Sequence, residues 1–151
     1  MVLTVSEMRK IAISAENLKH RLMIELAYTA GLRVSELVAV KVQHMNLNKL
    51  MLFVPGIGKP RARTTIFSGG LKDALQRQVG NKKPGDYLFP SERGGNLTTR
   101  SVTKFFKNAL TTSGVEKQVT PHSLRQSFTA FMLAKGTDRI AVQTLLGRRA
   151  L

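Results

Sequence analysis

The strongest constraint on the fold is an apolar stretch of helical periodicity near the N-terminus. Apolar residues recur three and four positions apart over residues 18–30, at Leu18, Leu22, Met23, Leu26, Ala27 and Ala30. This spacing places them on one face of a helix, and Gly31 then supplies the left-handed residue on which helices commonly end. Because the stretch is mostly apolar, we expect the helix over 18–30 to run through the protein core.

The remaining segments predict an α+β fold that is mainly helical, with a small antiparallel sheet. Thr4 and Glu7 have capping-box spacing, which predicts a helix over 5–13. Strands are expected at 50–54 (LMLFV) and 64–67 (TTIF), joined as a β-hairpin by the loop PGIGKPRAR. Further helices are expected over 69–79, 99–112, 121–135 and 138–146, with a helical turn at VSEL and an extended piece at 87–90. A chain of 151 residues suits one domain with one core.

The charge balance narrows the class of partner. The chain has 24 Lys plus Arg against 9 Asp plus Glu, a formal net charge of +15. Such an excess repels itself in a compact state, so we expect a polyanionic partner, and double-stranded DNA is favoured over an anionic membrane surface. Aromatic residues make up only 6% of the chain and Trp is absent, which makes an RNA-binding protein the weaker interpretation.

Cysteine and histidine usage restricts the chemistry. The chain has no Cys and three scattered His residues, so thiolate nucleophiles, disulfides and a metal site are not expected, and no cofactor is predicted. Glu25 interrupts the most apolar run, LMIELA, and no segment has the length of a signal-peptide core or a membrane span. We therefore expect a cytoplasmic protein that does not associate with membranes.

The segment TPHSLRQSF carries a candidate phosphate site. On a helix, His122 and Arg125 lie one turn apart on one face, while Leu124 and Phe128 lie on another. A guanidinium and an imidazole near a helix N-terminus, whose free N–H groups also favour anions, suit a phosphate. The alternative is that His122 joins the helix cap and Arg125 makes a surface ion pair.

GLRVSEL and the hairpin loop add further candidates. Arg33 lies in apolar sequence, where a charge is unfavourable unless a carboxylate or phosphate meets it. Glu36, three positions on, can orient Arg33, and a purely structural Arg33–Glu36 ion pair is the alternative. Lys59 lies in the loop GIGKPRAR, where Arg61 and Arg63 add positive charge expected to bind DNA. The alternative for this loop is a hairpin that only contacts the DNA backbone.

The helix expected over 99–112 offers a basic face. Arg100, Lys104 and Lys107 lie on adjacent turns and could contact a DNA groove or the phosphate backbone. A solvated basic face that covers the core is the alternative for these residues.

Taken together, GLRVSEL, a hairpin carrying Gly-Lys, YLFP, HSLRQSF and LLG, in this order, resemble the catalytic domain of the tyrosine recombinases, the phage integrase family. The resemblance covers essentially the whole chain. It implies the catalytic-domain fold of that family, with Lys59 on its β-hairpin, and site-specific DNA cleavage and rejoining in recombination or integration.

The resemblance also implies a role for each matching residue. In that family two arginines and a histidine grip the scissile phosphate, matched here by Arg33, Arg125 and His122. A hairpin lysine, matched by Lys59, protonates the leaving 5′-oxygen. A tyrosine attacks phosphorus and gives a 3′-phosphotyrosyl intermediate.

Two features depart from the family pattern. After LLG the family usually has His, occasionally Trp, whereas this chain has Arg148, which can donate to phosphate but cannot accept a proton. The nucleophilic tyrosine normally lies in a further helix, and neither Tyr28 in the core helix nor Tyr87 in YLFP matches its place. We therefore expect residues 1–151 to form a single catalytic domain without the N-terminal core-binding domain and the tyrosine-bearing C-terminal segment, and to be inactive alone.

Two functional interpretations stay open. The chain is either part of a recombinase from a prokaryote, phage or plasmid that acts as a dimer or tetramer on DNA, or a non-catalytic DNA-binding module, such as a decayed integrase acting as a regulator. A tyrosine in the remainder of the protein would distinguish the first from the second.

Overall fold

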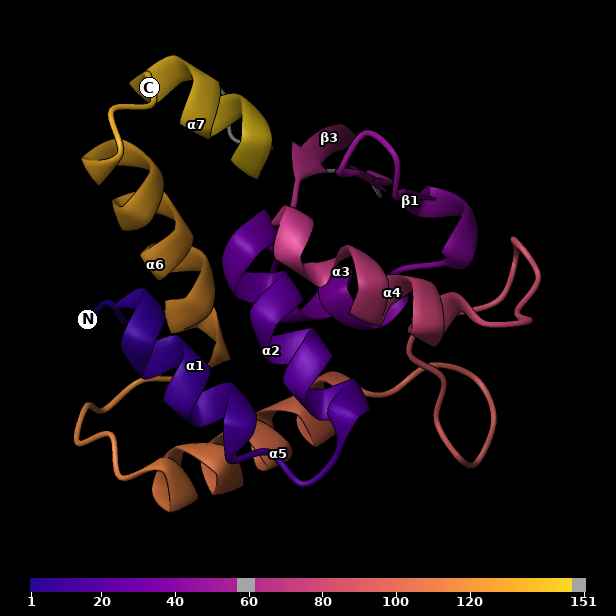
Figure 1. Ribbon diagram of the computed structural model, residues 1–151, viewed down its shortest axis with the longest axis horizontal. Coiled ribbons are helices and arrows are strands. Elements are labelled where there is room, and N and C mark those ends of the chain that lie inside the picture. Colours follow the sequence, from indigo (N-terminus) through magenta and orange to yellow (C-terminus); the bar gives the residue numbers. More distant parts are fainter. Residues whose placement is uncertain (57–61, 148–151) are drawn as a thin grey trace.

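The computed structural model describes residues 1–56 and 62–147 and shows a mainly helical chain with a three-stranded antiparallel sheet (Figure 1). This confirms the predicted fold class. The helices are α1 (Val5–Ile13), α2 (Leu18–Ala30), α3 (Val34–Ala39), α4 (Lys72–Val79), α5 (Thr99–Ser113), α6 (Pro121–Ala134) and α7 (Arg139–Leu146). The strands are β1 (Met45–Asn46), β2 (Met51–Val54) and β3 (Arg63–Ile66), and short 3-10 turns cover Val42–His44 (η1) and Gly69–Leu71 (η2).

Helix α2 runs through the core, as its sequence pattern predicts. Seven of its residues are buried, and it packs against α1, α5 and α6. The Asn17 side chain accepts from the His20 N–H at the start of the helix, and Gly31 ends it with φ of 70°. A Cβ at Gly31 would lie 2.6 Å from Cδ2 of Phe128, so both the backbone angle and the packing of α6 require glycine there.

Side-chain caps define the ends of two other helices. Thr4 and Glu7 form the predicted capping box at the start of α1, with both reciprocal hydrogen bonds present. Helix α6 begins at Pro121, after a cap in which Thr120 and Ser123 bond reciprocally. These caps satisfy backbone N–H groups that have no partner within the helix, which is why the predicted starting residues are correct.

The sheet lies at one end of the molecule together with α7, while α5 lies at the other end and α2 extends between them (Figure 1). Its strand order is β1-β2-β3, and Val54 pairs with Arg63 where the hairpin opens. Leu52 and Val54 are buried while Met51 and Phe53 are exposed, the alternation expected of a sheet with one covered face. On β3 the buried positions are Arg63 and Thr65.

The structure departs from the sequence pattern mainly at short or glycine-rich segments. The expected helix over 69–79 begins with the 3-10 turn η2, in which the Ser68 hydroxyl accepts from the Gly70 N–H, and becomes α-helical only at Lys72. Adjacent Gly69 and Gly70 favour helix poorly, which accounts for the tighter first turn. The extended piece at 87–90 makes isolated bridges to the rest of the chain, Lys41 with Tyr87 and Pro90 with Asn96.

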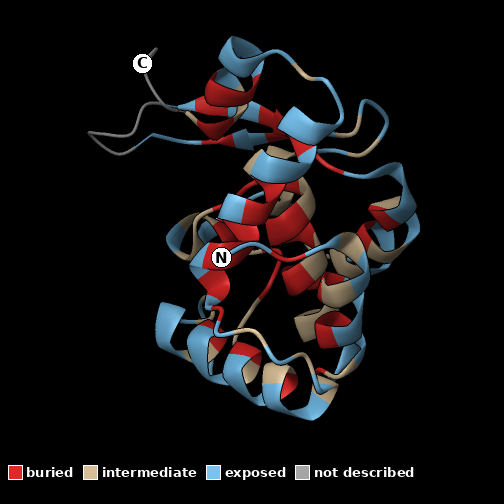
Figure 2. Cartoon of the chain, turned by 90° about the vertical axis from the view of Figure 1, so that its left-hand side faces the viewer, coloured by how far each residue is buried: buried red, intermediate tan, exposed pale blue. Residues whose placement is uncertain are grey.

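Buried residues concentrate on the inward faces of the helices and in the sheet (Figure 2). A large cluster surrounds α2, and a smaller one joins α6 to α7 through Phe128, Met132, Val142 and Leu146. Within the ranges described, no helix combines the length and the apolar character needed to cross a bilayer.

The close contact at Gly31 predicts a large effect of a single methyl group. Gly31→Ala should lower the free energy of unfolding by about 2–4 kcal/mol, because a left-handed alanine and an overpacked contact with Phe128 add together. Urea denaturation monitored by circular dichroism measures this loss. Gly136→Ala is the control, since Gly136 also has positive φ but has no atom within 4 Å of the added Cβ. Equal losses at the two positions would contradict the packing argument.

Candidate active site

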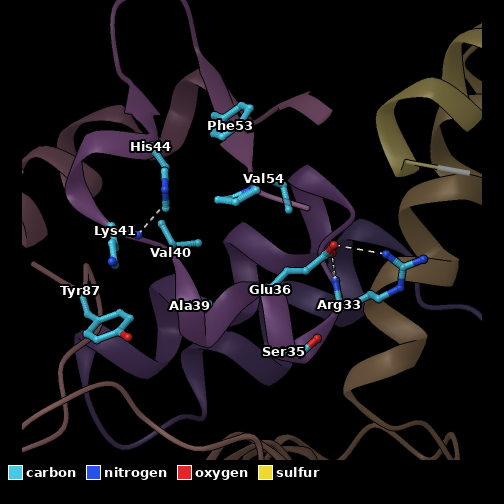
Figure 3. A pocket seen from close by; sticks show the side chains of 11 residues that line it. Arg33, Ser35, Glu36, Ala39, Val40, Lys41, His44, Phe53, Val54 and Tyr87 are labelled. Carbon is cyan, nitrogen blue, oxygen red and sulfur yellow. Dashed lines mark hydrogen bonds and ion pairs between the residues drawn. The ribbon is translucent and has the colours of Figure 1, made fainter. Parts of the chain in front are cut away.

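The site is centred on Glu36, one turn into α3. Arg33 is the N-cap of this helix, and its backbone N–H donates to Oε1 of Glu36 at 2.8 Å. Its Nη1 donates to Oε2 of the same carboxylate at 3.2 Å, so the two residues predicted to interact do so (Figure 3). The Arg33 side chain is 35% exposed and that of Glu36 is 11% exposed. Glu36 therefore holds the Arg33 side chain on one side, while part of that side chain remains exposed to solvent.

Arg63 makes the closest contacts with Glu36. Its Nη1 lies 2.6 Å from Oε2 and its Nη2 lies 2.9 Å from Oε1, a bidentate pairing of two planar groups. Burial raises the pKa of the Glu36 carboxyl, but the hydrogen bonds from Arg63 and Arg33, together with their charges, outweigh burial and hold that pKa below its usual 4.5. Glu36 is thus a carboxylate in the folded protein at neutral pH.

Arg125 approaches the same carboxylate from α6. Its Nη1 lies 3.9 Å from Oε1 of Glu36, and its side chain is only 2% exposed. Nη1 also donates to the carbonyl of Gly31 at 2.6 Å, and Nη2 donates to the carbonyl of Leu146 at 2.8 Å. These carbonyls belong to the C-terminal ends of α2 and α7, where backbone acceptors lack helical partners and a cation is favoured.

Arg33 and Arg125, the two arginines expected to grip a phosphate, therefore meet at Glu36, although they come from segments far apart in the chain. His122 lies one turn before Arg125 on α6, and its side chain is exposed whereas that of Arg125 is buried. The two residues lie one turn apart as expected but differ in exposure, because the arginine turns inward to the two carbonyls.

Arg63 is a correction to the sequence analysis. It was expected to contact DNA from the hairpin, yet its side chain is 4% exposed and its Nε donates to the Leu145 carbonyl at 2.7 Å. The physical reason is strand register: Arg63 and Thr65 occupy the covered face of β3, two residues apart. The pattern of RTTI does not indicate this, because its one apolar residue, Ile66, lies on the opposite face of the strand from Arg63.

Lys59, Arg61 and Arg148 lie outside the described residues. The strand pair from Val54 to Arg63 defines the base of the connection that carries Lys59 and Arg61. Arg100 and Lys104 are exposed on α5, as the predicted basic face requires. Helix α5 lies at the end of the molecule opposite the sheet and α7 (Figure 1).

A pocket of about 480 Å³ adjoins Arg33 and Glu36 and extends along α3 toward β2 (Figure 3). Lys41 lines it, with Nζ 5.6 Å from the centre of the Tyr87 ring, and Nδ1 of His44 accepts from the Lys41 N–H at 3.0 Å. Tyr87 lies at the other end of the pocket from Arg33. Sequence reasoning did not identify Lys41 or His44, because their segment meets the segment of Tyr87 through long-range backbone pairing, which includes the bridge between Lys41 and Tyr87.

The arginine side chains around Glu36 are suited to binding an anion. Three guanidinium groups surround one carboxylate, which leaves an excess of positive charge next to the exposed edge of Arg33.

Tyr28 is buried, as expected, with its hydroxyl 3.4 Å from the Leu3 carbonyl. In the part of the chain that the structure describes, no group of three or more His, Cys, Asp or Glu side chains could hold a metal ion.

Comparison with known proteins gives consistent matches over nearly the whole chain. The family model described as "Phage integrase family" matches residues 1–150. Tyrosine recombinase XerD of Listeria monocytogenes is 33% identical over 160 residues, which cover 97% of this chain and 53% of that protein. Tyrosine recombinase XerA of Pyrococcus horikoshii is 36% identical over 153 residues, 99% of this chain and 53% of that protein.

Solved structures agree in fold. A XerA recombinase crystal structure superposes with a TM-score of 0.88 at 24% identity, covering 99% of this chain and 55% of that chain. The XerH recombinase bound to its difH substrate, in a pre-cleavage complex, superposes with a TM-score of 0.82 at 22% identity, covering 99% and 47%. At these identities the likeness establishes the fold alone.

The shared carboxylate predicts a strong effect of its neutralisation. Glu36→Gln should lower the free energy of unfolding by about 2–4 kcal/mol, because three buried or half-buried cations lose their counter-charge. Thermal and urea denaturation measure the change. Glu7→Gln is the matched control: Glu7 also pairs with a cation, Lys117 at 2.8 Å, but at the surface, where the loss should stay below about 1 kcal/mol. A smaller loss at Glu36 than at Glu7 would contradict the central role of this carboxylate.

Proposed function

Because this chain belongs to the phage integrase family, we propose that it forms the phosphate-gripping portion of a tyrosine recombinase, an enzyme that cleaves and rejoins DNA strands at specific sites. The chain spans about half the length of the curated relatives it matches, 53% of XerD and of XerA. The observation that carries the proposal is the meeting of Arg33 and Arg125 at one carboxylate, with unbalanced positive charge at the exposed edge of Arg33.

The proposed reaction exchanges one phosphoester bond for another. A tyrosine oxygen bonds to phosphorus while the bond from phosphorus to the 5′-oxygen breaks, which gives a 3′-phosphotyrosyl intermediate. His122 accepts the tyrosine proton, and Lys59 donates a proton to the leaving 5′-oxygen. The intermediate keeps the energy of the phosphoester, so a 5′-hydroxyl can rejoin the strand without an external energy source.

The arginines supply electrostatic stabilisation. Negative charge builds on the non-bridging oxygens of phosphorus as the nucleophile approaches, and positioned guanidinium groups stabilise it. Arg33 is exposed enough to meet such a phosphate, whereas Arg125 lies beneath the surface. Direct contact by Arg125 therefore requires a local rearrangement that exposes its guanidinium group to the phosphate. We assign Arg148 to the same phosphate as a hydrogen-bond donor.

Double-stranded DNA is the proposed partner. The net charge of +15 and the exposed cations of α5, Arg100 and Lys104, support binding to a phosphate backbone. Arg61 would add a contact from the hairpin connection. Among the structural neighbours, XerH is bound to difH and the Tn1549 integrase is in complex with DNA. We propose that the longer protein acts as a dimer or tetramer on DNA, in the cytoplasm.

A second candidate is a DNA-binding protein without catalysis, such as a decayed integrase acting as a regulator. The observation that favours it is that Tyr28 is buried in the core and Tyr87 lies across the pocket from Arg33. Catalysis thus depends on a tyrosine that these residues do not supply, and a covalent adduct distinguishes the two candidates.

The basic face of α5 predicts a measurable salt dependence. Binding of residues 1–151 to a mixed-sequence duplex of about 30 base pairs should weaken with added salt, and Arg100→Gln with Lys104→Gln should reduce the slope by about 2, since about two phosphate contacts are lost. Fluorescence anisotropy measures both. The charge-matched control, Lys10→Gln with Lys135→Gln, should keep the slope. Salt-independent binding would contradict the nucleic-acid assignment.

Removal of the partly exposed Arg33 should affect DNA cleavage much more than DNA binding. In the longer protein, Arg33→Ala should reduce the covalent protein–DNA adduct at least about 100-fold, while duplex affinity falls by less than about threefold because affinity is spread over many cations. Denaturing gels of reactions on its recombination site measure the adduct, and Arg77→Ala serves as an exposed-arginine control. Residues 1–151 alone should give no adduct, and an adduct from them would show that Tyr28 or Tyr87 is the nucleophile.

A further inference from the structure

The end of α7 lies directly against the side chain of Arg63. Gly147 ends this helix with φ of +75°, and a Cβ there would lie 2.6 Å from Cδ of Arg63, 3.2 Å from its Nη1 and 3.3 Å from its Nε. No real Cβ tolerates the first of these distances. The glycine of LLG is therefore required by a close approach to one buried arginine as well as by its backbone angle.

Arg63 uses all three guanidinium nitrogens to join two elements. Nε donates to the Leu145 carbonyl at 2.7 Å, in the last turn of α7. Nη1 and Nη2 donate to the two oxygens of Glu36, on α3. Arg125 takes the next carbonyl of α7, that of Leu146, at 2.8 Å. Two arginines thus hold adjacent carbonyls of one helix end, and both lie near the same carboxylate.

We propose that Arg63 is a positioning residue: it clamps the last turn of α7 to Glu36 and thereby sets where Arg33 and Arg125 present their charge. The contacts that form the clamp lie within this chain and do not depend on the proposed function. Only the identification of the bound anion as a phosphate rests on the proposed function. Because Arg63 begins β3, the clamp also anchors the returning strand of the hairpin that carries Lys59.

An arginine is needed for this geometry. A guanidinium presents N–H groups in one plane in three directions, which matches two carboxylate oxygens and a carbonyl at once. A lysine at position 63 would keep the charge but could not maintain the bidentate contact and the carbonyl contact together. Arg63→Lys therefore separates charge from geometry.

The first test compares two C-cap glycines with nearly the same backbone angle, of which Gly147 alone lies against Arg63. Gly147→Ala pushes on Arg63, whereas Gly114→Ala places alanine at the C-cap of α5 with nearly the same angle, φ of +76°, and no atom within 4 Å. The readout is the Glu36 carboxyl pKa, measured by carbon-detected NMR titration. The pKa should rise in Gly147→Ala and in Arg63→Lys and stay at its wild-type value in Gly114→Ala, although both alanine variants lose stability. An unchanged Glu36 pKa in Gly147→Ala and Arg63→Lys would overturn the clamp.

The wild-type protein provides a second test that needs no variant. A clamped guanidinium rotates slowly about its Nε–Cζ bond, so the Arg63 Nη atoms should give separate NMR signals at neutral pH and merge as acid protonates Glu36. Fast averaging at neutral pH would overturn the proposal, even if both variants failed to fold.

Titration with inorganic phosphate relates the clamp to function. The Arg33 Nε–H signal should shift on phosphate binding, and Arg63→Lys should weaken that binding by about threefold or more, while Gly114→Ala should not. Unchanged phosphate affinity in Arg63→Lys would overturn the positioning role. If the Arg33 signal of the wild-type protein did not change on addition of phosphate, the proposed phosphate site and the functional part of this proposal would both be wrong. The Glu36 titration would still decide whether the clamp exists.

Discussion

One partly buried carboxylate organises the charged end of this protein. Glu36 of α3 receives cations from the N-cap of its own helix, from β3 and from α6, and without it these like charges would repel one another at close range. The desolvation of the carboxylate is offset by hydrogen bonds to both of its oxygens, as its lowered pKa indicates. Two of these arginines also donate to the last carbonyls of α7, so the side chains that set the electrostatics of the site also attach the sheet and α7 to the helical core.

The helices could be predicted from the sequence because local signals determine their ends. The Thr4–Glu7 capping box, Gly31 and Pro121 act within a few residues of their own position, and the structure places helix ends at each of them. Strand β1 has only two residues, too few for any alternation to show, and it exists because β2 pairs with it. The 3-10 turn at Gly69 has a local cause, the poor helix propensity of two adjacent glycines, which the spacing of the apolar residues does not indicate.

The site was predictable to the extent that it follows from short motifs. Arg33 and Glu36 lie within one turn, so their contact follows from helical spacing, while the approach of Arg125 depends on how α6 packs against α2. Arg63 was misassigned because charge in a hairpin suggests solvent exposure, whereas its register turns it inward. Lys41 and His44 were not predicted, because pairing between distant segments forms the pocket that they line, and sequence periodicity does not indicate such pairing.

The attachment of α7 has a consequence for the dynamics of the site. This helix is held by a small apolar cluster and by two arginines at its last carbonyls, whereas α2 lies within the main core. Local opening should therefore begin at α7, so its amide protons should exchange with solvent earlier than those of α2. Each such opening removes one carbonyl partner from Arg63 and one from Arg125. The availability of Arg125 to an anion is thus tied to the local stability of one short helix.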